Sequence, residues 1–460
     1  MLDVGKTLAK MTLWSPDRRL IDRLTRANER SVGTDYPSLD IGGITAWLES
    51  ALKNFARQGD IAAIIPVGHG AAACVVDDQG LCLAPLDYEA ELPADLRAQY
   101  LALRDPFRLT GSPALPAGLN LGAQLFWLEA IAPEALRRGR IVTWPQYWAW
   151  LLSGVAASEI TSLGCHSDLW LPREAKPSPL AQARGWAQRL APLRQAHEVL
   201  GPVSQDWRER CGLPADCMVL CGLHDSNAAL QAARLYDEVG KRDCTILSTG
   251  TWFVALRSGA KDIDLASLPE SRDCLVNVDV AGALIPASRF MGGREAEILE
   301  QAESTPIDPT RETSALLRRA GELVRAGVMA LPAVQPGVGP FPQNAARWIG
   351  RPADDQLGRR AAAGLYLALM SDAALDLIGS RDRLVIEGRF AGDPVFTQAL
   401  AALRPNQTFY LSSEENNLPF GALSLVDARL PPQAMLMRAP PLALNLEAYA
   451  KQWRALAGAG

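Results

Sequence analysis

The feature that most restricts the fold is the segment Gly222–Trp252, where an acidic turn is followed by a hairpin of small residues. Asp225 lies in GLHDSN, where a strand should pass into a helix, and neither Lys nor Arg adjoins it. The hairpin LSTGTW (Leu247–Trp252) is expected between strands 245–249 and 253–256. It offers closely spaced N–H groups and hydroxyls with little bulk, as a phosphate cradle requires. Asp225 could equally be a helix N-cap and LSTGTW an ordinary hairpin, but their pairing favours phosphoryl transfer to a hydroxyl with Asp225 as general base.

The N-terminus supplies a second acidic hairpin. Met1–Thr7 reads MLDVGKT, and Leu8–Trp14 is expected to return from it as a strand. Asp3, Gly5, Lys6 and Thr7 place a carboxylate, a flexible backbone and a cation on one turn. GKT is not a Walker A loop, because that loop needs a Gly five residues before its GK and a preceding strand.

These segments together resemble the FGGY carbohydrate kinases over nearly the whole chain. Asp3–Thr7 matches the family's first phosphate hairpin, with Lys6 in place of the commoner Thr. HGA (His69–Ala71) and LAPLDYE (Leu83–Glu89) are similar to the sugar-side segments. GLHDSNAAL resembles the catalytic-Asp segment, and LSTGTW the second phosphate hairpin. DVGKT and GCHSDLW (Gly164–Trp170) look most like a divergent branch that includes rhamnulose- and fuculose-type kinases.

The C-terminal part resembles the adenosine-binding region of that family. The matching segments are LVIEGRFAGDPVFTQALAAL (Leu384–Leu403) and PFGALSLV (Pro419–Val426). The family's usual Gly-Gly-Gly is reduced here to Glu387–Arg389, and its usual polar continuation is absent.

The resemblance implies an α/β protein with the two-domain actin/hexokinase-like (ribonuclease H-like) fold and an interdomain cleft. It implies an N-terminal domain over 1–221, a C-terminal domain over 222–435, and a helical segment over 436–460 that packs back on the body. The implied reaction is ATP-dependent phosphorylation of a ketose such as rhamnulose, fuculose, xylulose or ribulose. The resemblance assigns Asp3 and Asp225 to Mg²⁺, with Asp3 holding the metal through water. The ATP-binding residues that it implies are Asp3, Gly5, Lys6, Thr7, Ser248, Thr249, Gly250, Thr251, Gly388 and Gly421, and its sugar-binding residues are His69, Gly70 and Asp168.

The histidines add detail to the sugar side. His69 lies between two glycines after an expected strand, which favours a sugar-hydroxyl contact over a structural role. His166 and Asp168 could contact sugar or stabilise their own loop, and both interpretations stay open. His224 precedes Asp225 and, by strand alternation, is expected to point away from it, so we assign it no catalytic role.

Composition excludes several other classes. The chain has 460 residues, enough for two large domains. Its net charge of −5 provides no basic surface for nucleic acid. Among the 8 cysteines, Cys211, Cys217 and Cys221 cluster without zinc-site spacing, so buried reduced thiols are expected. Ala361–Met370 is too short to span a bilayer and predicts a core helix. No signal peptide is evident, the cytoplasm is the expected compartment, and a homodimer is left open.

Hydrophobic periodicity predicts the main elements. Expected strands cover Ile61–Pro66 and Cys74–Val76. Expected helices cover Ile44–Ala56, Leu119–Ile131, Thr143–Ser153 and Leu357–Ile378, the first of them after a break at Gly42–Gly43. The Trp-rich helix is expected to pack in the core rather than to form a sugar-stacking platform. Leu331–Pro342 predicts an irregular loop and a candidate hinge.

The first strand is short, with only two residues before Asp3. Either the native start lies upstream, or the strand is held by fewer ladder hydrogen bonds than usual, and in both cases we expect it to be frayed.

Two other functional classes fit the same fold. One is a non-catalytic, actin-like nucleotide-binding or regulatory protein, for which the altered Glu387–Arg389 segment argues and against which the retained Asp225 argues. The other is a hydrolase of nucleotides or polyphosphate. His69 and the large N-terminal segment argue for a sugar acceptor instead, and sugar-dependent ADP release would separate the three classes.

Overall fold

A computed structural model describes residues 1–32, 36–240, 242–261, 263–301, 309–412, 418–427, 430–432 and 435–458. The chain forms two compact units, each assembled from separate stretches of sequence. Unit 1 contains Met1–Ala232, Val276–Leu284 and Asn417–Leu430, and unit 2 contains Ala233–Leu275, Ile285–Asn416 and Pro431–Gly460. The units therefore differ from the ranges expected from sequence. The segment after Cys221 up to Ala232 belongs with the N-terminal residues, and the chain returns twice to unit 1.

Unit 1 is built around a five-stranded sheet in the order β17-β7-β1-β2-β3. Its strands are β1 (Leu2–Val4), β2 (Leu8–Trp14), β3 (Leu20–Ala27), β7 (Pro66–Gly68) and β17 (Leu223–His224). β1 and β2 form an antiparallel hairpin, whereas β1, β7 and β17 run parallel.

Two smaller sheets have the orders β10-β8-β9 and β15-β16-β6. Their strands are β6 (Ala63–Ile64), β8 (Ala73–Asp77), β9 (Gly80–Leu83), β10 (Arg140–Thr143), β15 (Val199–Pro202) and β16 (Met218–Leu220).

Helices cover these sheets. The main helices of unit 1 are α1 (Ile41–Ala56), α2 (Ala94–Leu103), α4 (Leu121–Ile131), α5 (Pro133–Arg138), α6 (Trp144–Ser153), α9 (Gln205–Cys211), α10 (Asp225–Ala233) and α15 (Leu418–Leu423). Trp144, Tyr147 and Trp148 of α6 are all buried, which confirms that the Trp-rich helix packs in the core. Cys211, Cys217 and Cys221 are buried free thiols, also as expected.

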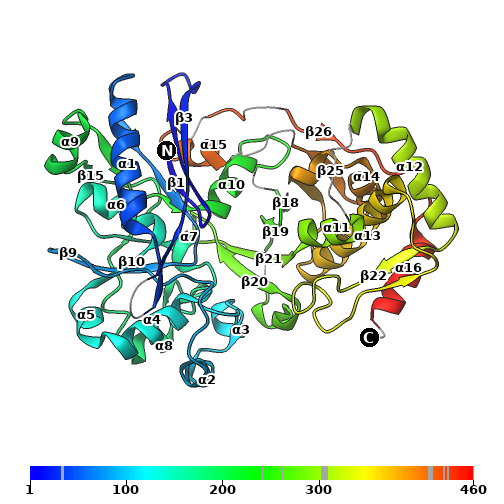
Figure 1. The fold of residues 1–460 in the computed structure, drawn as a ribbon, viewed down its shortest axis with the longest axis horizontal. Helices are drawn as coiled ribbons and strands as arrows, with labels where there is room; N and C mark the ends of the chain where they lie inside the picture. Colours follow the sequence, from blue (N-terminus) through cyan, green and yellow to red (C-terminus); the bar gives the residue numbers. More distant parts are fainter. Residues whose placement is uncertain are drawn as a thin grey trace. The chain divides into compact units, whose positions relative to one another are not determined.

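Unit 2 has a second sheet in which β21, β19, β18, β24, β25 and β26 follow one another. These strands are β18 (Cys244–Thr249), β19 (Phe253–Ser258), β21 (Leu284–Phe290), β24 (Arg383–Gly388), β25 (Thr408–Leu411) and β26 (Met437–Arg438). β18 and β19 are the strand pair predicted around LSTGTW. The main helices are α11 (Gly292–Glu300), α12 (Pro309–Arg325), α13 (Gln356–Leu377), α14 (Pro394–Leu403) and α16 (Glu447–Ala457). Figure 1 shows α13 beside α12 and α14, and the Ala-rich stretch of α13 is buried there as predicted.

The C-terminal helix α16 packs back on unit 2. Trp453 is fully buried and donates its indole N–H to the backbone oxygen of Ala330 at 2.7 Å. In the described parts of the chain, none of the helices combines the length and the apolar character needed to cross a bilayer.

Three local expectations are wrong. The expected helix break at Gly42–Gly43 lies inside α1, because Asp40 caps the helix and accepts the Gly43 N–H at 2.8 Å. The single strand expected over 61–66 is two strands, β6 and β7, which join different sheets. The first strand is not frayed: β1 is bonded on both sides, to β2 and β7, and Leu2 and Val4 are fully buried. A short strand in the middle of a sheet has partners that strand length alone does not reveal.

Candidate active site

Three parallel strands of unit 1 end side by side. Val4 of β1 and His224 of β17 both pair with Gly68 of β7. The residues that follow, Gly5, His69 and Asp225, therefore leave the sheet at one edge. In open α/β sheets, ligands bind at the carboxyl ends of the strands. The sheet thus brings together three candidate residues that the sequence separates widely.

Asp225 is the first residue of α10, directly after β17. Its Oδ1 accepts the Ser226 N–H at 2.5 Å and the Ser226 hydroxyl at 3.3 Å. An N-cap carboxylate would instead bind N–H groups two or three residues along the helix. Burial raises the pKa of Asp225 to about 6, although the Ser226 bonds oppose that shift. A carboxylate that titrates near neutral pH is suited to accept a proton.

Asp3 and Lys10 form an ion pair on the sheet of unit 1. They face each other across β1 and β2, and Lys10 Nζ lies 3.7 Å from Asp3 Oδ2. Burial and the negative charge of Asp225 together raise the pKa of Asp3 to about 6, although Lys10 opposes the shift. Lys10 was missed from the sequence, although the hairpin register would have placed it opposite Asp3.

The β1–β2 turn holds Gly5, Lys6 and Thr7. The Gly5 N–H closes the turn on Leu8 O, and Asn28 braces it by bonding the backbone oxygens of Gly5 and Thr7. Asn28 was not anticipated, because its contact is long-range.

Lys6 is held by acidic residues of the LAPLDYE segment. Its Nζ is paired with Asp87, lies 3.9 Å from Glu89 and sits 4.5 Å above the ring of Tyr88. The expectation of a cation available to phosphate therefore needs correction, since the Lys6 ammonium is already neutralised by a buried carboxylate.

His69 follows β7 and is enclosed by aromatic rings. It stacks on Trp144 at 5.5 Å and meets the edge of Tyr88 at 5.1 Å. Its Nδ1 accepts the Ala71 N–H at 3.3 Å, whereas its buried Nε2 has no hydrogen-bond partner among the described residues. Burial lowers the pKa of His69 to about 3, so the ring is neutral. An unpaired buried nitrogen is costly unless a ligand satisfies it.

Gly70 has a packing role. A Cβ there would lie 2.7 Å from the sulfur of Cys165 and 3.2 Å from the ring of His224. The absence of a side chain lets the segment pack against these two residues, which is a different reason for glycine from the expected approach of a sugar.

Asp168 and His166 hold their own loop. The Asp168 carboxylate is fully buried and accepts bonds from Arg104, at 2.9 and 3.0 Å, and from the hydroxyl of Tyr100. His166 Nδ1 donates to Leu119 O at 2.9 Å. Of the two interpretations left open, these contacts favour the structural one, and Asp168 is corrected from a candidate sugar contact to a buried partner of Arg104.

His224 does not point away from Asp225. Its Nε2 lies 3.1 Å from Asp225 Oδ1, which contradicts the expectation from strand alternation. The strand ends at His224 and the helix begins at the next residue, so the alternation of a strand does not apply across this turn.

The LSTGTW hairpin of unit 2 uses its hydroxyls internally. Ser248 Oγ donates to Glu387 Oε1 at 2.5 Å, and Thr249 Oγ1 donates to Glu387 O at 2.5 Å. These two hydroxyls therefore tie the hairpin to β24, whereas the sequence analysis assigned Ser248 and Thr249 to ATP binding. Gly250, which is half-buried, and the exposed Thr251 form the turn, and the N–H of Gly293 at the start of α11 donates to Thr251 O at 3.2 Å.

The two glycines assigned to adenosine permit close backbone contacts. Gly388 has φ +86°, and a Cβ there would lie 2.5 Å from Thr249 O. A Cβ on Gly421 would lie 1.7 Å from Ala228 O, so this glycine lets α15 pack on α10, as Figure 1 also shows. Gly388 belongs to unit 2 and Gly421 to unit 1.

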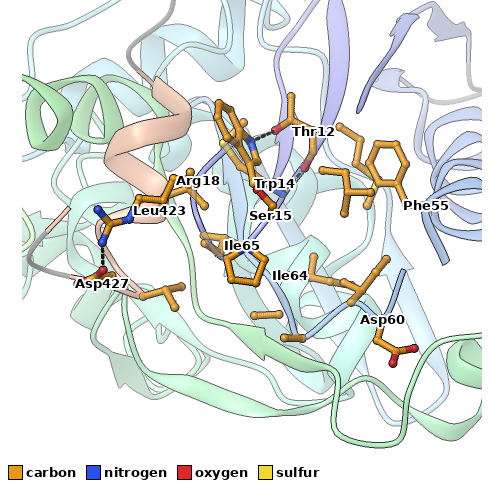
Figure 2. Close-up of a pocket in the computed structure, with 18 of the residues that line it drawn as sticks. Thr12, Trp14, Ser15, Arg18, Phe55, Asp60, Ile64, Ile65, Leu423 and Asp427 are labelled. Atoms are coloured by element: carbon orange, nitrogen blue, oxygen red, sulfur yellow. Dashed lines mark hydrogen bonds and ion pairs between the residues drawn. The ribbon is translucent and has the colours of Figure 1, made fainter. Parts of the chain in front are cut away.

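A cavity of about 380 Å³ lies elsewhere in unit 1. Met1, Met11 and Ile65 line it, at the end of β1 opposite to Gly5. Figure 2 shows Trp14 bonded to Thr12 in its wall, and Arg18 paired with Asp427 beside α15. Among the described residues, none of the predicted site residues lines this cavity, so it is separate from the candidate site.

The carboxylates of Asp3 and Asp225 suit a divalent cation. The charge of Asp225 raises the pKa of Asp3, as expected for two carboxylates close enough to repel each other. Mg²⁺ in phosphoryl-transfer sites is held by one or two carboxylates together with substrate phosphates. Among the described residues, no cluster of three or more His, Cys, Asp or Glu side chains could hold a metal by protein ligands alone.

Comparison with known proteins places this geometry in a family. Residues 241–434 match the carbohydrate kinase FGGY, C-terminal domain. A carbohydrate kinase from Novosphingobium aromaticivorans is 47% identical over 99% of both chains, with a TM-score of 0.95. A xylulose kinase from Rhodospirillum rubrum (17% identity, 100% of this chain and 97% of that chain, TM-score 0.76) has the same fold. So does a Plasmodium falciparum glycerol kinase with ADP (11% identity, 100% and 96%, TM-score 0.78). A search of curated proteins returned no match.

The fold is thus the two-domain actin/hexokinase-like fold, and the enzyme class is the one that the hairpins and Asp225 indicated from sequence. With these similarities along its whole length, the chain belongs to the FGGY carbohydrate kinases.

Proposed function

We propose that the protein transfers the terminal phosphate of ATP to a hydroxyl of a ketose, with Asp225 as general base. The observation that carries the proposal is the common edge at which β1, β7 and β17 end, since it gathers Gly5, His69 and Asp225. As the hydroxyl oxygen attacks phosphorus, its proton passes to the carboxylate of Asp225, and the bond from phosphorus to ADP breaks.

The turns at Gly5–Thr7 and Gly250–Thr251 are the proposed phosphate-binding segments. Both are short, and Gly5 and Gly250 carry no side chain, so that a phosphate oxygen can approach backbone N–H groups. We assign Mg²⁺ to Asp3 and Asp225, where a bound ion would offset the negative charge of the phosphates. Lys10 is a further cation beside Asp3.

The sugar is proposed to lie beside His69. Its unpaired Nε2 offers one hydrogen bond to a hydroxyl, and the neighbouring half-buried Tyr88 provides aromatic surface. Xylulose and ribulose differ in the orientation of one hydroxyl, and so do rhamnulose and fuculose, so the ketose must be found by experiment. The cytoplasm is the proposed compartment, because the reaction consumes ATP.

A coupled assay of ADP release with a ketose panel tests the proposal. The wild-type protein should release ADP only when the correct ketose is present. Asp225→Asn should lower turnover by roughly 10²–10⁴-fold, as expected for a lost general base, while calorimetry shows nearly unchanged ATP binding. Asp78→Asn, at an exposed turn, is the matched control and should retain full turnover. Near wild-type turnover of Asp225→Asn on the same ketose would remove Asp225 from the mechanism.

A further inference from the structure

The imidazole of His224 touches the carboxylate assigned as the base. His224 Nε2 lies 3.1 Å from Asp225 Oδ1, and the His224 side chain is only 6% exposed. The same nitrogen lies 3.5 Å from Cys165 Sγ, and Nδ1 lies 3.4 Å from Asn227 Nδ2. The ring therefore has a neighbour at each nitrogen.

These neighbours define which nitrogen carries the hydrogen. The ionised carboxylate of Asp225 can only accept, so a hydrogen bond across the 3.1 Å to His224 Nε2 requires the hydrogen to be on that nitrogen. The amide nitrogen of Asn227 can only donate, so the His224 Nδ1 facing it accepts. The hydrogen then resides on Nε2, which faces the acceptor oxygen of Asp225.

The surroundings of His224 fix the position of the ring. A Cβ on Gly70 would lie 3.2 Å from His224 Cδ2, which shows how closely that backbone covers the ring. The backbone N–H of His224 donates to Thr161 Oγ1 at 3.0 Å, and that hydroxyl donates to Glu159 Oε2 at 2.5 Å. The buried Glu159 also accepts the N–H groups of Thr161 and Ser162. The end of β17 is thus anchored in the core of unit 1.

We propose that His224 is a positioning residue: its imidazole donates from Nε2 to Oδ1 of Asp225 and fixes the orientation of that carboxylate. The bonds from His224 and from the Ser226 N–H both converge on Oδ1. Oδ2 is then the oxygen that receives the proton of the sugar hydroxyl. This inference rests on the proposed role of Asp225 as general base.

The test compares two substitutions that differ in the donor. His224→Leu removes the N–H, whereas His224→Gln places an amide N–H near the position of Nε2. We expect His224→Leu to lower kcat about tenfold, equivalent to about 1.4 kcal/mol of barrier, with little change in KM for ATP or sugar. His224→Gln should recover most of that loss. Cys165→Ala is the matched control, because it disturbs the packing of the same ring without touching the donor to Asp225, and it should keep most of the wild-type kcat.

Nitrogen-15 spectra give a readout independent of turnover. The chain has 4 histidines, so the side-chain signals of His224 can be assigned by substitution. The wild-type protein should show the Nε2–H tautomer, and Asp225→Ala should shift the Nε2 signal. A hydrogen on Nδ1 would overturn the proposal even if His224→Leu failed to fold.

The outcomes separate the two proposals. An inactive Asp225→Asn together with a folded His224→Leu of wild-type kcat would refute only the positioning role of His224. A fully active Asp225→Asn would refute the general base itself. A His224→Leu that loses kcat without rescue by His224→Gln would also contradict the inference, because it would assign the loss to packing rather than to the donated hydrogen bond.

Discussion

Asp168 provides a sharp test of whether a buried acid near the sugar side binds substrate or holds the fold. Its side chain is 0% exposed, and Arg104, its partner, is 9% exposed. Asp168→Asn keeps the shape but removes the charge opposite the guanidinium. Breaking a buried ion pair from one side costs about 3–5 kcal/mol. Arg104 also donates to Ser112 O at 2.6 Å, so one of its hydrogen bonds remains in the variant. We therefore expect the lower end of this range of destabilisation, about 3 kcal/mol.

A loss of folding stability of that size is readily measured by thermal unfolding. For a unit of this size, about 3 kcal/mol corresponds to a fall of roughly 6–12 °C in Tm. We expect Asp168→Asn to show this fall by calorimetry, with an unchanged KM for the ketose. Arg104→Met should cost a similar amount, and the double variant should cost less than the sum, because neither charge is then left unpaired. A wild-type Tm combined with a raised KM for the ketose would refute the structural role and return Asp168 to the sugar site.

Four further predictions test other parts of the structure. Gly421→Ala should lower Tm by several degrees, because its Cβ would lie 1.7 Å from a backbone oxygen of α10, whereas Gly59→Ala, with open space around it, should not. Burial raises the pKa of Glu159 to about 7, so its contribution to stability is present below pH 4.5 and is lost as pH rises through 7. Urea unfolding should therefore show the wild-type protein losing stability across this pH range relative to Glu159→Gln. If the free energy of unfolding of the two proteins changed in parallel with pH, the raised pKa of Glu159 would be contradicted. Gly250 has no positive φ, and a Cβ there would meet only a backbone oxygen at 3.8 Å, so Gly250→Val should fold and raise the KM for ATP while leaving sugar binding alone. His69→Ala should weaken ketose binding by about 0.5–1.5 kcal/mol and leave ATP affinity unchanged by calorimetry, and the reverse pattern would move His69 out of the sugar site.

Much of the local structure is readable from the sequence. The hairpins at Gly5–Thr7 and Gly250–Trp252, the start of a helix at Asp225, and the long buried helix α13 all follow from turn residues and periodicity. These features depend on neighbours within a few residues, which is why their signals are present in the chain itself. The family resemblance also came from such short segments and was confirmed.

The sequence by itself therefore determined the elements, the family and the position of Asp225, whereas the tertiary structure decided what most polar side chains contact. Lys6 is paired with Asp87, Asp168 with Arg104, and Ser248 with Glu387. Each of these pairs joins segments far apart in the chain, so neither residue spacing nor hydrophobic periodicity predicts it. The direction of His224 was decided by the passage from strand to helix at one peptide bond, where neither periodicity holds. Contacts of this kind arise only when the sheet brings strand ends together and burial forces each charge to find a partner.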